Sequence, residues 1–214
     1  MSNLKADQNN KIYLSIANGK LVQKVPAGTP GAVERKWEVG GKSGTKYELV
    51  FDNISGKITG VSFYNGEKDG RKFQNLIVEF DEFDGKTPVL SINSKTKYAE
   101  DIMKKLPNVD LSQEVKVRPF SFTPEGEDRA VTGVDLRQGN EWGTSVKDYY
   151  YDKEKKQTLH GAPEPTKEEK EEGDWETYYR RRNKFFIKAT TERFQIVEQT
   201  SYPTKDINPE DIPF

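Results

Sequence analysis

The sequence predicts a mainly β protein with one internal helix, a C-terminal helix and a flexible acidic tail. Three observations support this fold class. Apolar and polar side chains alternate with a period of two through most of the first 140 residues, as half-buried strands require. Short runs rich in Gly, Asn and Asp separate these segments and are typical of turns. Helical spacing of apolar residues occurs once in this region and again near the C-terminus.

The predicted strands begin with a hairpin. The alternation of residues 11–17 resumes in residues 20–25 after an Asn18-Gly19 turn, a dipeptide that favours tight hairpins. Further strands are expected at residues 35–39, 45–51, 54–64, 71–80, 88–93, 113–122 and 129–137.

The internal helix is expected at residues 96–106. Apolar residues from Tyr98 to Leu106 recur at helical spacing, and Pro107 lies just beyond the end. Short strands that are bent by Gly56 and Gly60 and interrupted late by a single helix resemble an OB-fold barrel. In that fold the helix commonly lies between the third and fourth strands. The N-terminal hairpin is then either an addition to the barrel or its first strand split in two.

The character of the chain changes after Gly139. An exposed hairpin is expected between residues 145 and 160, followed by a Pro-rich linker. Thr166 and Glu169 have the spacing of a capping box, so a helix is expected to start there and run past Arg182. Its apolar stripe would contain Trp175, Tyr178, Tyr179, Arg182, Phe186 and Ala189.

Composition limits the possible functions. The chain has 34 basic and 35 acidic residues and no Cys, which excludes disulfides and Cys-ligated zinc. Without an apolar N-terminal segment or a long apolar run, we expect a cytoplasmic protein. The charges are segregated, because residues 11–47 hold seven basic residues against two acids. A basic face is therefore compatible with the net charge of −1.

Cations interleaved with aromatic rings are what single-stranded nucleic acid requires, because cations meet phosphates and rings stack on bases. The other interpretation is that the rings belong to the core and the lysines only solubilise the chain. The candidate nucleic-acid-binding residues are Lys11, Tyr13, Lys20, Lys24, Arg35, Lys36, Trp37, Lys42, Lys46, Tyr64, Arg71 and, on the C-terminal helix, Arg181.

The last nine residues combine acids with an Ile-Pro-Phe ending and a terminal carboxylate. Two prolines and few apolar residues predict a flexible tail. Such a tail suits a basic groove on another protein, where the Phe fills a pocket and a cation meets the carboxylate. The candidate partner-binding residues are Asp206, Glu210, Asp211, Ile212, Pro213 and Phe214.

Acidic residues followed by the final Asp211-Ile212-Pro213-Phe214 resemble the C-terminal tip of bacterial single-stranded DNA-binding proteins, which recruits replication and repair enzymes. The resemblance covers residues 206–214, and Asn208 and Pro209 interrupt the usual run of acids. Because no other stretch closely matches the bacterial protein, it points to a phage- or plasmid-encoded relative. It implies a protein of the bacterial cytoplasm that coats unpaired DNA and serves replication, recombination and repair.

This interpretation divides the chain into three parts. Residues 1–140 would form the nucleic-acid-binding domain, residues 141–197 the hairpin, linker and helix, and residues 198–214 the tail. We expect no catalytic residue, metal or cofactor. Two other classes remain open: a Mg²⁺-dependent nuclease with carboxylates at Asp52 and between Glu79 and Asp84, and an acidic module that imitates nucleic acid.

Overall fold

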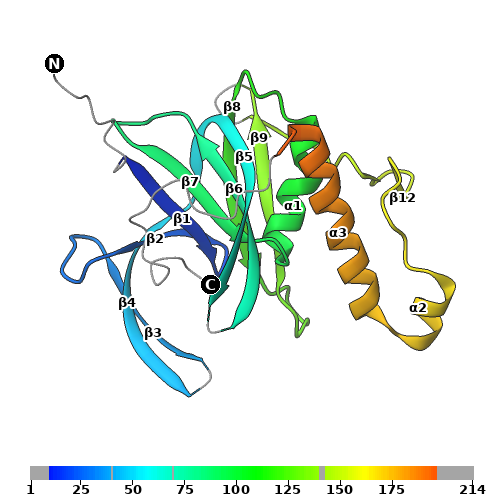
Figure 1. Cartoon of the computed structure of the whole chain (residues 1–214), viewed down its shortest axis with the longest axis horizontal. Coiled ribbons are helices and arrows are strands. Elements are labelled where there is room, and N and C mark those ends of the chain that lie inside the picture. The colour runs from blue at the N-terminus through cyan, green and yellow to red at the C-terminus, as the bar shows by residue number, and fades with distance from the viewer. Residues whose placement is uncertain (1–9, 40, 69, 140–142, 197–214) are drawn as a thin grey trace.

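The computed structural model describes residues 10–39, 41–68, 70–139 and 143–196. The mainly β class is confirmed, because ten of the described strands form one large sheet (Figure 1). The strands of this sheet are β1 (Lys11–Ala17), β2 (Lys20–Val25), β3 (Val33–Val39), β4 (Lys42–Phe51), β5 (Ile54–Lys68), β6 (Arg71–Phe80), β7 (Thr87–Asn93), β8 (Glu114–Phe122), β9 (Val131–Gln138) and β10 (Thr144–Ser145). Two further strands, β11 (Tyr151–Asp152) and β12 (Gln157–Thr158), form the expected exposed hairpin.

The large sheet is continuous but does not close into the expected barrel. Its order is β10-β9-β8-β5-β6-β7-β1-β2-β4-β3. Two strands change partners along their length. The first four residues of β5 pair with β8, and β5 pairs with β6 from Ile58 onward, with a bulge between Ile58 and Gly60. Likewise, β1 pairs in parallel with β7 and then antiparallel with β2, so the N-terminal hairpin extends the sheet beyond β7.

One face of the sheet forms the core with helix α1 (Lys97–Lys105). Leu14, Leu76 and Leu90 point to this face and belong to the same buried cluster as Ile102 and Met103 of α1. The helix starts at Thr96, whose side chain accepts a hydrogen bond from the Ala99 backbone, and the 3-10 turn η1 (Leu106–Asn108) follows it. The predicted internal helix is confirmed.

Helix α1 also covers the part of the β9 edge that β10 leaves unpaired. A carboxylate oxygen of Asp101 accepts a hydrogen bond of 3.1 Å from the Val134 N–H, and Lys105 Nζ donates to the Val134 carbonyl. Beyond these contacts, the Leu136 carbonyl accepts from the Val146 N–H. Unpaired strand edges otherwise invite pairing with other chains. Helix side chains, β10 and residue 146 thus occupy the edge of β9, so no further strand of the described sheet pairs there and the sheet remains open.

The C-terminal region contains two helices, where the sequence analysis expected one. The capping box of Thr166 and Glu169 is confirmed at the start of α2 (Lys167–Glu172). Gly173 then adopts a left-handed conformation (φ 68°) and ends α2, and α3 (Trp175–Phe194) begins in a new direction after Asp174. Figure 1 shows α3 beside α1 on the side away from β3 and β4.

Only part of the expected apolar stripe of α3 is buried. Phe186 and Tyr178 are buried, and Phe186 belongs to the main core cluster. Trp175 and Tyr179 are 45% and 55% exposed, so their predicted place on a buried stripe is wrong. None of the described helices has the length and apolar character needed to cross a bilayer.

Candidate nucleic-acid interface

The strand register brings most of the candidate cations and rings to one face of the sheet. Directly opposed residues on neighbouring strands point to the same side, and alternate residues along a strand share that side. Following the register from β3 to β5 places nine candidates on the side opposite the main core cluster. This outer face contains Lys11, Tyr13, Lys20, Lys24, Arg35, Trp37, Lys46, Tyr64 and Arg71.

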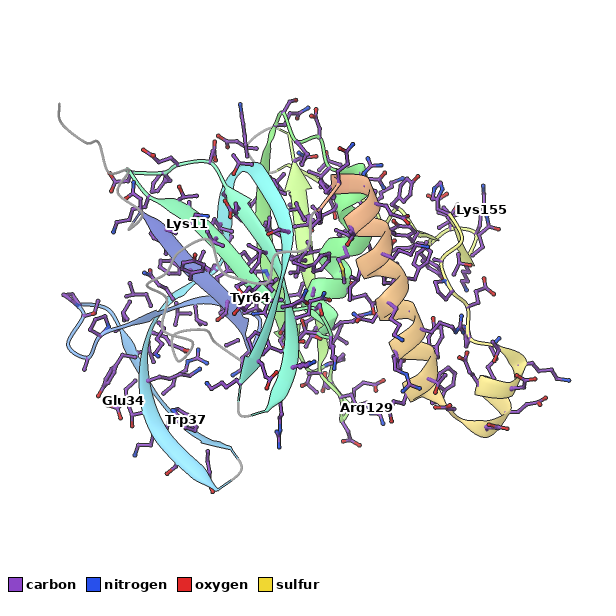
Figure 2. The ribbon with its side chains drawn as sticks, in the orientation of Figure 1. Lys11, Glu34, Trp37, Tyr64, Arg129 and Lys155 are labelled. Atoms are coloured by element: carbon purple, nitrogen blue, oxygen red, sulfur yellow. The ribbon has the colours of Figure 1, made fainter. Side chains whose placement is uncertain are left out.

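Trp37 lies on the β3–β4 hairpin, which extends away from the body of the protein, whereas Tyr64 lies near the middle of the sheet (Figure 2). Trp37 is 39% exposed and is therefore not a core aromatic. Its ring lies across Gly44, where an added Cβ would be 2.8 Å from the Trp37 ring. Gly44 therefore lets the indole lie flat on β4, so its other side can accept a stacked base.

Tyr64 forms a second aromatic position on the outer face. Its ring centroid is 5.9 Å from that of Phe73 on β6, and the two rings are tilted by 56°. Both side chains are partly buried. The sequence analysis did not select Phe73 or Lys68, although both lie on the outer face. The period-two alternation of β5 and β6 was the signal that could have found them.

Carboxylates on the same face neutralise several of these cations. Lys11 Nζ is 2.8 Å from Glu79 Oε1, and Lys20 Nζ is 2.5 Å from Asp52 Oδ1. The hydrogen bond from Lys20, together with its charge, holds the pKa of Asp52 below its ordinary value. These pairs are partly or fully exposed to solvent, so they are weak and a phosphate can compete for the lysines.

Glu48 pairs differently, because its side chain is only 2% exposed. Lys46 Nζ lies 2.7 Å from Oε1, and Arg35 Nε lies 3.0 Å from Oε2. Oε2 accepts no hydrogen bond from any described residue, so its contact with Arg35 is purely an ion pair. A buried carboxylate requires such cations to offset the cost of its desolvation.

Cations nevertheless outnumber acids on the outer face. With Lys68 included, the register places seven cations there against Glu48, Asp52 and Glu79. The surplus gives the face a positive potential in a chain whose net charge is −1.

Among the candidate cations whose side chains the structure describes, two are not brought to this face. Lys36 lies on the opposite side of β3, together with Glu34 and Glu38. Arg181 Nη2 binds Glu169 Oε2 at 2.7 Å and the Glu164 carbonyl at 2.8 Å, so it joins α3 to α2 and the linker. Lys42 starts β4, but its side chain lies outside the description.

The tail candidates, Asp206 and the residues from Glu210 to Phe214, also lie outside the described residues.

Three of the carboxylates proposed for a nuclease make other contacts. Asp52 and Glu79 each pair with a lysine, and Asp81 Oδ1 accepts a hydrogen bond of 2.8 Å from the Lys57 N–H. In the described part of the chain, no three His, Cys, Asp or Glu side chains are grouped so that they could hold a metal ion.

Comparisons with protein-family models, with curated proteins and with solved structures gave no match.

Proposed function

We propose that this protein binds single-stranded DNA without sequence specificity, coats unpaired strands and recruits replication, recombination or repair proteins through its C-terminal tail. The observation that carries the proposal is the collection of nine candidate residues on one face by pairings that span β1 to β6. These residues were selected from the sequence as phosphate and base contacts. Lysines that only solubilise the chain would also lie on this side, so the feature that distinguishes the face is the presence of Trp37 and Tyr64 among them.

The strand order supports an open variant of the OB-fold. We assign its five strands to β5, β6, β7, β8 and β9, with α1 between the third and the fourth. OB-folds bind oligonucleotides on the face of their second and third strands and with the loops that join strands one to two and four to five. Here those strands are β6 and β7, whose outer sides belong to the outer face, and the N-terminal hairpin is an addition that widens it.

The two loops of this assignment carry cations. Lys68 and Arg71 flank the turn between β5 and β6, and Arg129 lies in the exposed connection between β8 and β9 (Figure 2). Bound phosphates would therefore meet positive charge at these two loops as well as on the outer face.

A fluorescence titration with oligo-dT, without metal, tests the proposal. We expect saturable binding whose affinity falls as salt rises, with a slope of about 0.7 per phosphate contact on logarithmic axes. Duplex DNA of the same length is the control and should bind more weakly. Degradation of the oligonucleotide on addition of Mg²⁺ would instead identify a nuclease, and absence of both binding and cleavage would favour the nucleic-acid mimic.

A further inference from the structure

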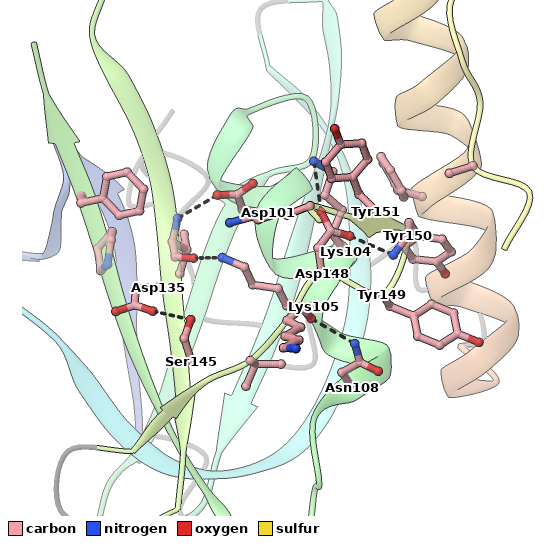
Figure 3. Close-up of a pocket in the computed structure, with 18 of the residues that line it drawn as sticks. Asp101, Lys104, Lys105, Asn108, Asp135, Ser145, Asp148, Tyr149, Tyr150 and Tyr151 are labelled. Atoms are coloured by element: carbon pink, nitrogen blue, oxygen red, sulfur yellow. Dashed lines mark hydrogen bonds and ion pairs between the residues drawn. The ribbon is translucent and has the colours of Figure 1, made fainter. Parts of the chain in front are cut away.

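A second group of cations and aromatic rings lines a cleft of about 1960 Å³. The outer sides of β8 and β9 form one wall, residues 145–165 form the other, and the C-terminal half of α1 lies between them (Figure 3). Ten cations and seven acids line the cleft. It is thus positive in a chain with a net charge of −1.

The β8 wall carries two cations followed by two rings on one side of the strand. Lys116, Arg118, Phe120 and Phe122 share this side by the period of two. Phe122 is 56% exposed, and its ring centroid is 6.1 Å from that of Phe120. Phe120 in turn lies against Gly133, where an added Cβ would be 2.7 Å from its ring. The two rings form a platform whose outer end is open to solvent.

Lys105 lies at the base of the cleft and donates to the Val134 carbonyl (Figure 3). Burial is the main cause that lowers its pKa, and Lys153 on the opposite wall lowers it further, whereas Asp101, Asp135 and Asp148 act against this. No described carboxylate lies within ion-pair distance of Lys105 Nζ. An anion that enters the cleft would therefore stabilise the ammonium of Lys105, whose charge is only partly compensated by the protein.

The opposite wall repeats the combination of rings and cations. Tyr149 and His160 stack with ring centroids 3.8 Å apart and an interplanar angle of 8°. Tyr151 is 38% exposed. Among the described residues, Lys147, Lys153 and Lys156 on this wall have no ion-pair partner, and neither does Lys116 across the cleft. Both walls therefore present flat rings beside cations that are available to phosphates.

The cleft is continuous with the outer face. Lys20 and its partner Asp52 line the cleft, and the register also places Lys20 on the outer face. They lie beside the β1–β2 turn, which packs so closely on β8 that an added Cβ at Gly19 would be 2.3 Å from the Ser121 nitrogen. A strand that leaves the outer face at Lys20 can therefore enter the cleft beside the same lysine.

We propose that this cleft is a second contact surface for single-stranded nucleic acid, used by strands too long to be held by the outer face alone. The proposal rests on the proposed function. It commits to nucleic acid because the lining offers stacking rings on both walls in addition to positive charge, and successive bases would use several rings whereas the acidic residues 206–214 have one ring, Phe214.

Two lengths of oligo-dT test the inference, with Phe122→Ala and Lys116→Gln as separate variants. The shorter is about 8 nucleotides, within the 4–16 nucleotides of one OB-fold, and the longer is several times that length. We expect Phe122→Ala to weaken binding of the long strand by about tenfold while leaving the short strand unchanged. Lys116→Gln should reduce the salt slope for the long strand by about 0.7 and leave the short-strand slope unchanged.

Trp37→Ala is the matched control, because it should weaken binding of both lengths. Thermal melting confirms that the variants fold, which is expected because Phe122 and Lys116 lie outside the main core cluster. Unchanged long-strand binding in both cleft variants would overturn the inference, as would an equal loss for both lengths. A further experiment uses a chain that lacks residues 206–214 and a separate peptide of those residues. If Phe122→Ala weakened binding of this peptide but not of the long strand, the cleft would bind peptide instead of nucleic acid. Failure of the wild type to bind either length would refute the proposed function itself.

Discussion

Arg35 Nε lies 3.0 Å from Oε2 of Glu48, a buried carboxylate on a hairpin that is otherwise largely exposed. The same carboxylate holds Lys46 at 2.7 Å, so one acid restrains two cations of the outer face. A phosphate that approaches Arg35 or Lys46 must compete with Glu48, which cannot leave because β2, β3 and β4 surround it.

Replacing Glu48 by Gln should have opposite effects on stability and binding. Loss of the buried charge leaves Arg35 and Lys46 close together, so the free energy of unfolding measured with urea should fall by about 1–3 kcal/mol. This loss is smaller than for a fully buried pair, because both cations are partly solvated. Affinity for oligo-dT should increase several-fold at low salt, because both cations become available to phosphate. Unchanged affinity in a folded Glu48→Gln protein would show that neither cation meets a phosphate.

Trp37→Ala should weaken binding of oligo-dT by about 1–3 kcal/mol, since the exposed indole would no longer stack on a base. Intrinsic fluorescence should be quenched on binding by the wild type. The matched control is Trp175→Ala on α3, a comparably exposed tryptophan that lies away from the outer face. Equal losses of affinity in the two variants would contradict a specific role of Trp37.

Gly133→Ala should destabilise the fold by about 1–3 kcal/mol through overpacking. An added Cβ would be 2.4 Å from Asp101 Oδ2 and 2.7 Å from the Phe120 ring, and would disturb the hydrogen bond from the Val134 N–H to Asp101. Gly60→Ala is the control, because its nearest neighbour would be the Glu79 side chain at an ordinary 3.6 Å. Urea denaturation of both variants measures the difference, and equal midpoints would argue against the tight contact at Gly133.

Glu100 should make stability depend on acid pH. Burial acts to raise the pKa of this carboxyl, but Lys104, Lys97 and Arg182 outweigh it and hold the pKa below the ordinary 4.5. Because the pKa of Glu100 is lower in the folded state, its contribution to stability is complete above the pKa of the unfolded state. That contribution is lost as the pH falls through the pKa of the folded state.

Urea midpoints measured between pH 6 and about pH 3 should therefore fall less steeply in Glu100→Gln than in the wild type. Glu171→Gln provides a control, because its ion pair with Lys167 is exposed at both side chains. If the urea midpoint of Glu100→Gln fell with pH as steeply as that of the wild type, other carboxylates would cause the acid sensitivity.

Deleting residues 206–214 should abolish recruitment of partner proteins while leaving strand binding intact or slightly tighter, because the tail acids repel phosphate. Deleting Phe214 alone should also abolish recruitment, since a short peptide depends on very few anchoring contacts. A pull-down of bacterial replication and repair proteins compares these variants with the wild type. Equal recovery with the Phe214 deletion, or loss of DNA binding in the longer deletion, would exclude the tail as the recruiting element.

Local patterns predicted the elements better than their arrangement. The alternation of residues 11–17 correctly placed Tyr13 opposite Leu14, and Thr96 and Pro107 correctly marked the limits of the internal helix. The parallel pairing of β1 with β7 joins residues more than 70 positions apart, and no local signal specifies it. The gathering of Lys11, Tyr64 and Trp37 on one face follows from such pairings and could not be predicted from spacing alone.

The apolar stripe predicted for α3 shows a different limit, because tertiary contacts decide which residues of an apolar helical stripe are buried. Trp175 and Tyr179 fit the same stripe as Phe186, but Arg182 and Phe186 lie further along α3, where Arg182 binds Glu100 of α1 and Phe186 is buried. Of the rings in the first turns of α3, Tyr178 is buried, whereas Trp175 and Tyr179 remain exposed. The cleft was missed because its walls come from distant segments. Its β8 wall did leave a signal, because two cations and then two rings share one side of a single strand: Lys116, Arg118, Phe120 and Phe122.

The position of β3 at one end of the described sheet has a consequence for self-association. Its outer edge presents backbone groups that another β strand could pair with, and such edges are common starting points for aggregation. Four of its seven residues, Glu34, Arg35, Lys36 and Glu38, are charged, with both signs represented. A parallel copy in register would place like charges opposite one another, which disfavours that mode of edge-to-edge growth. Lys36, which lies away from the proposed interface, is one of the charges that oppose it.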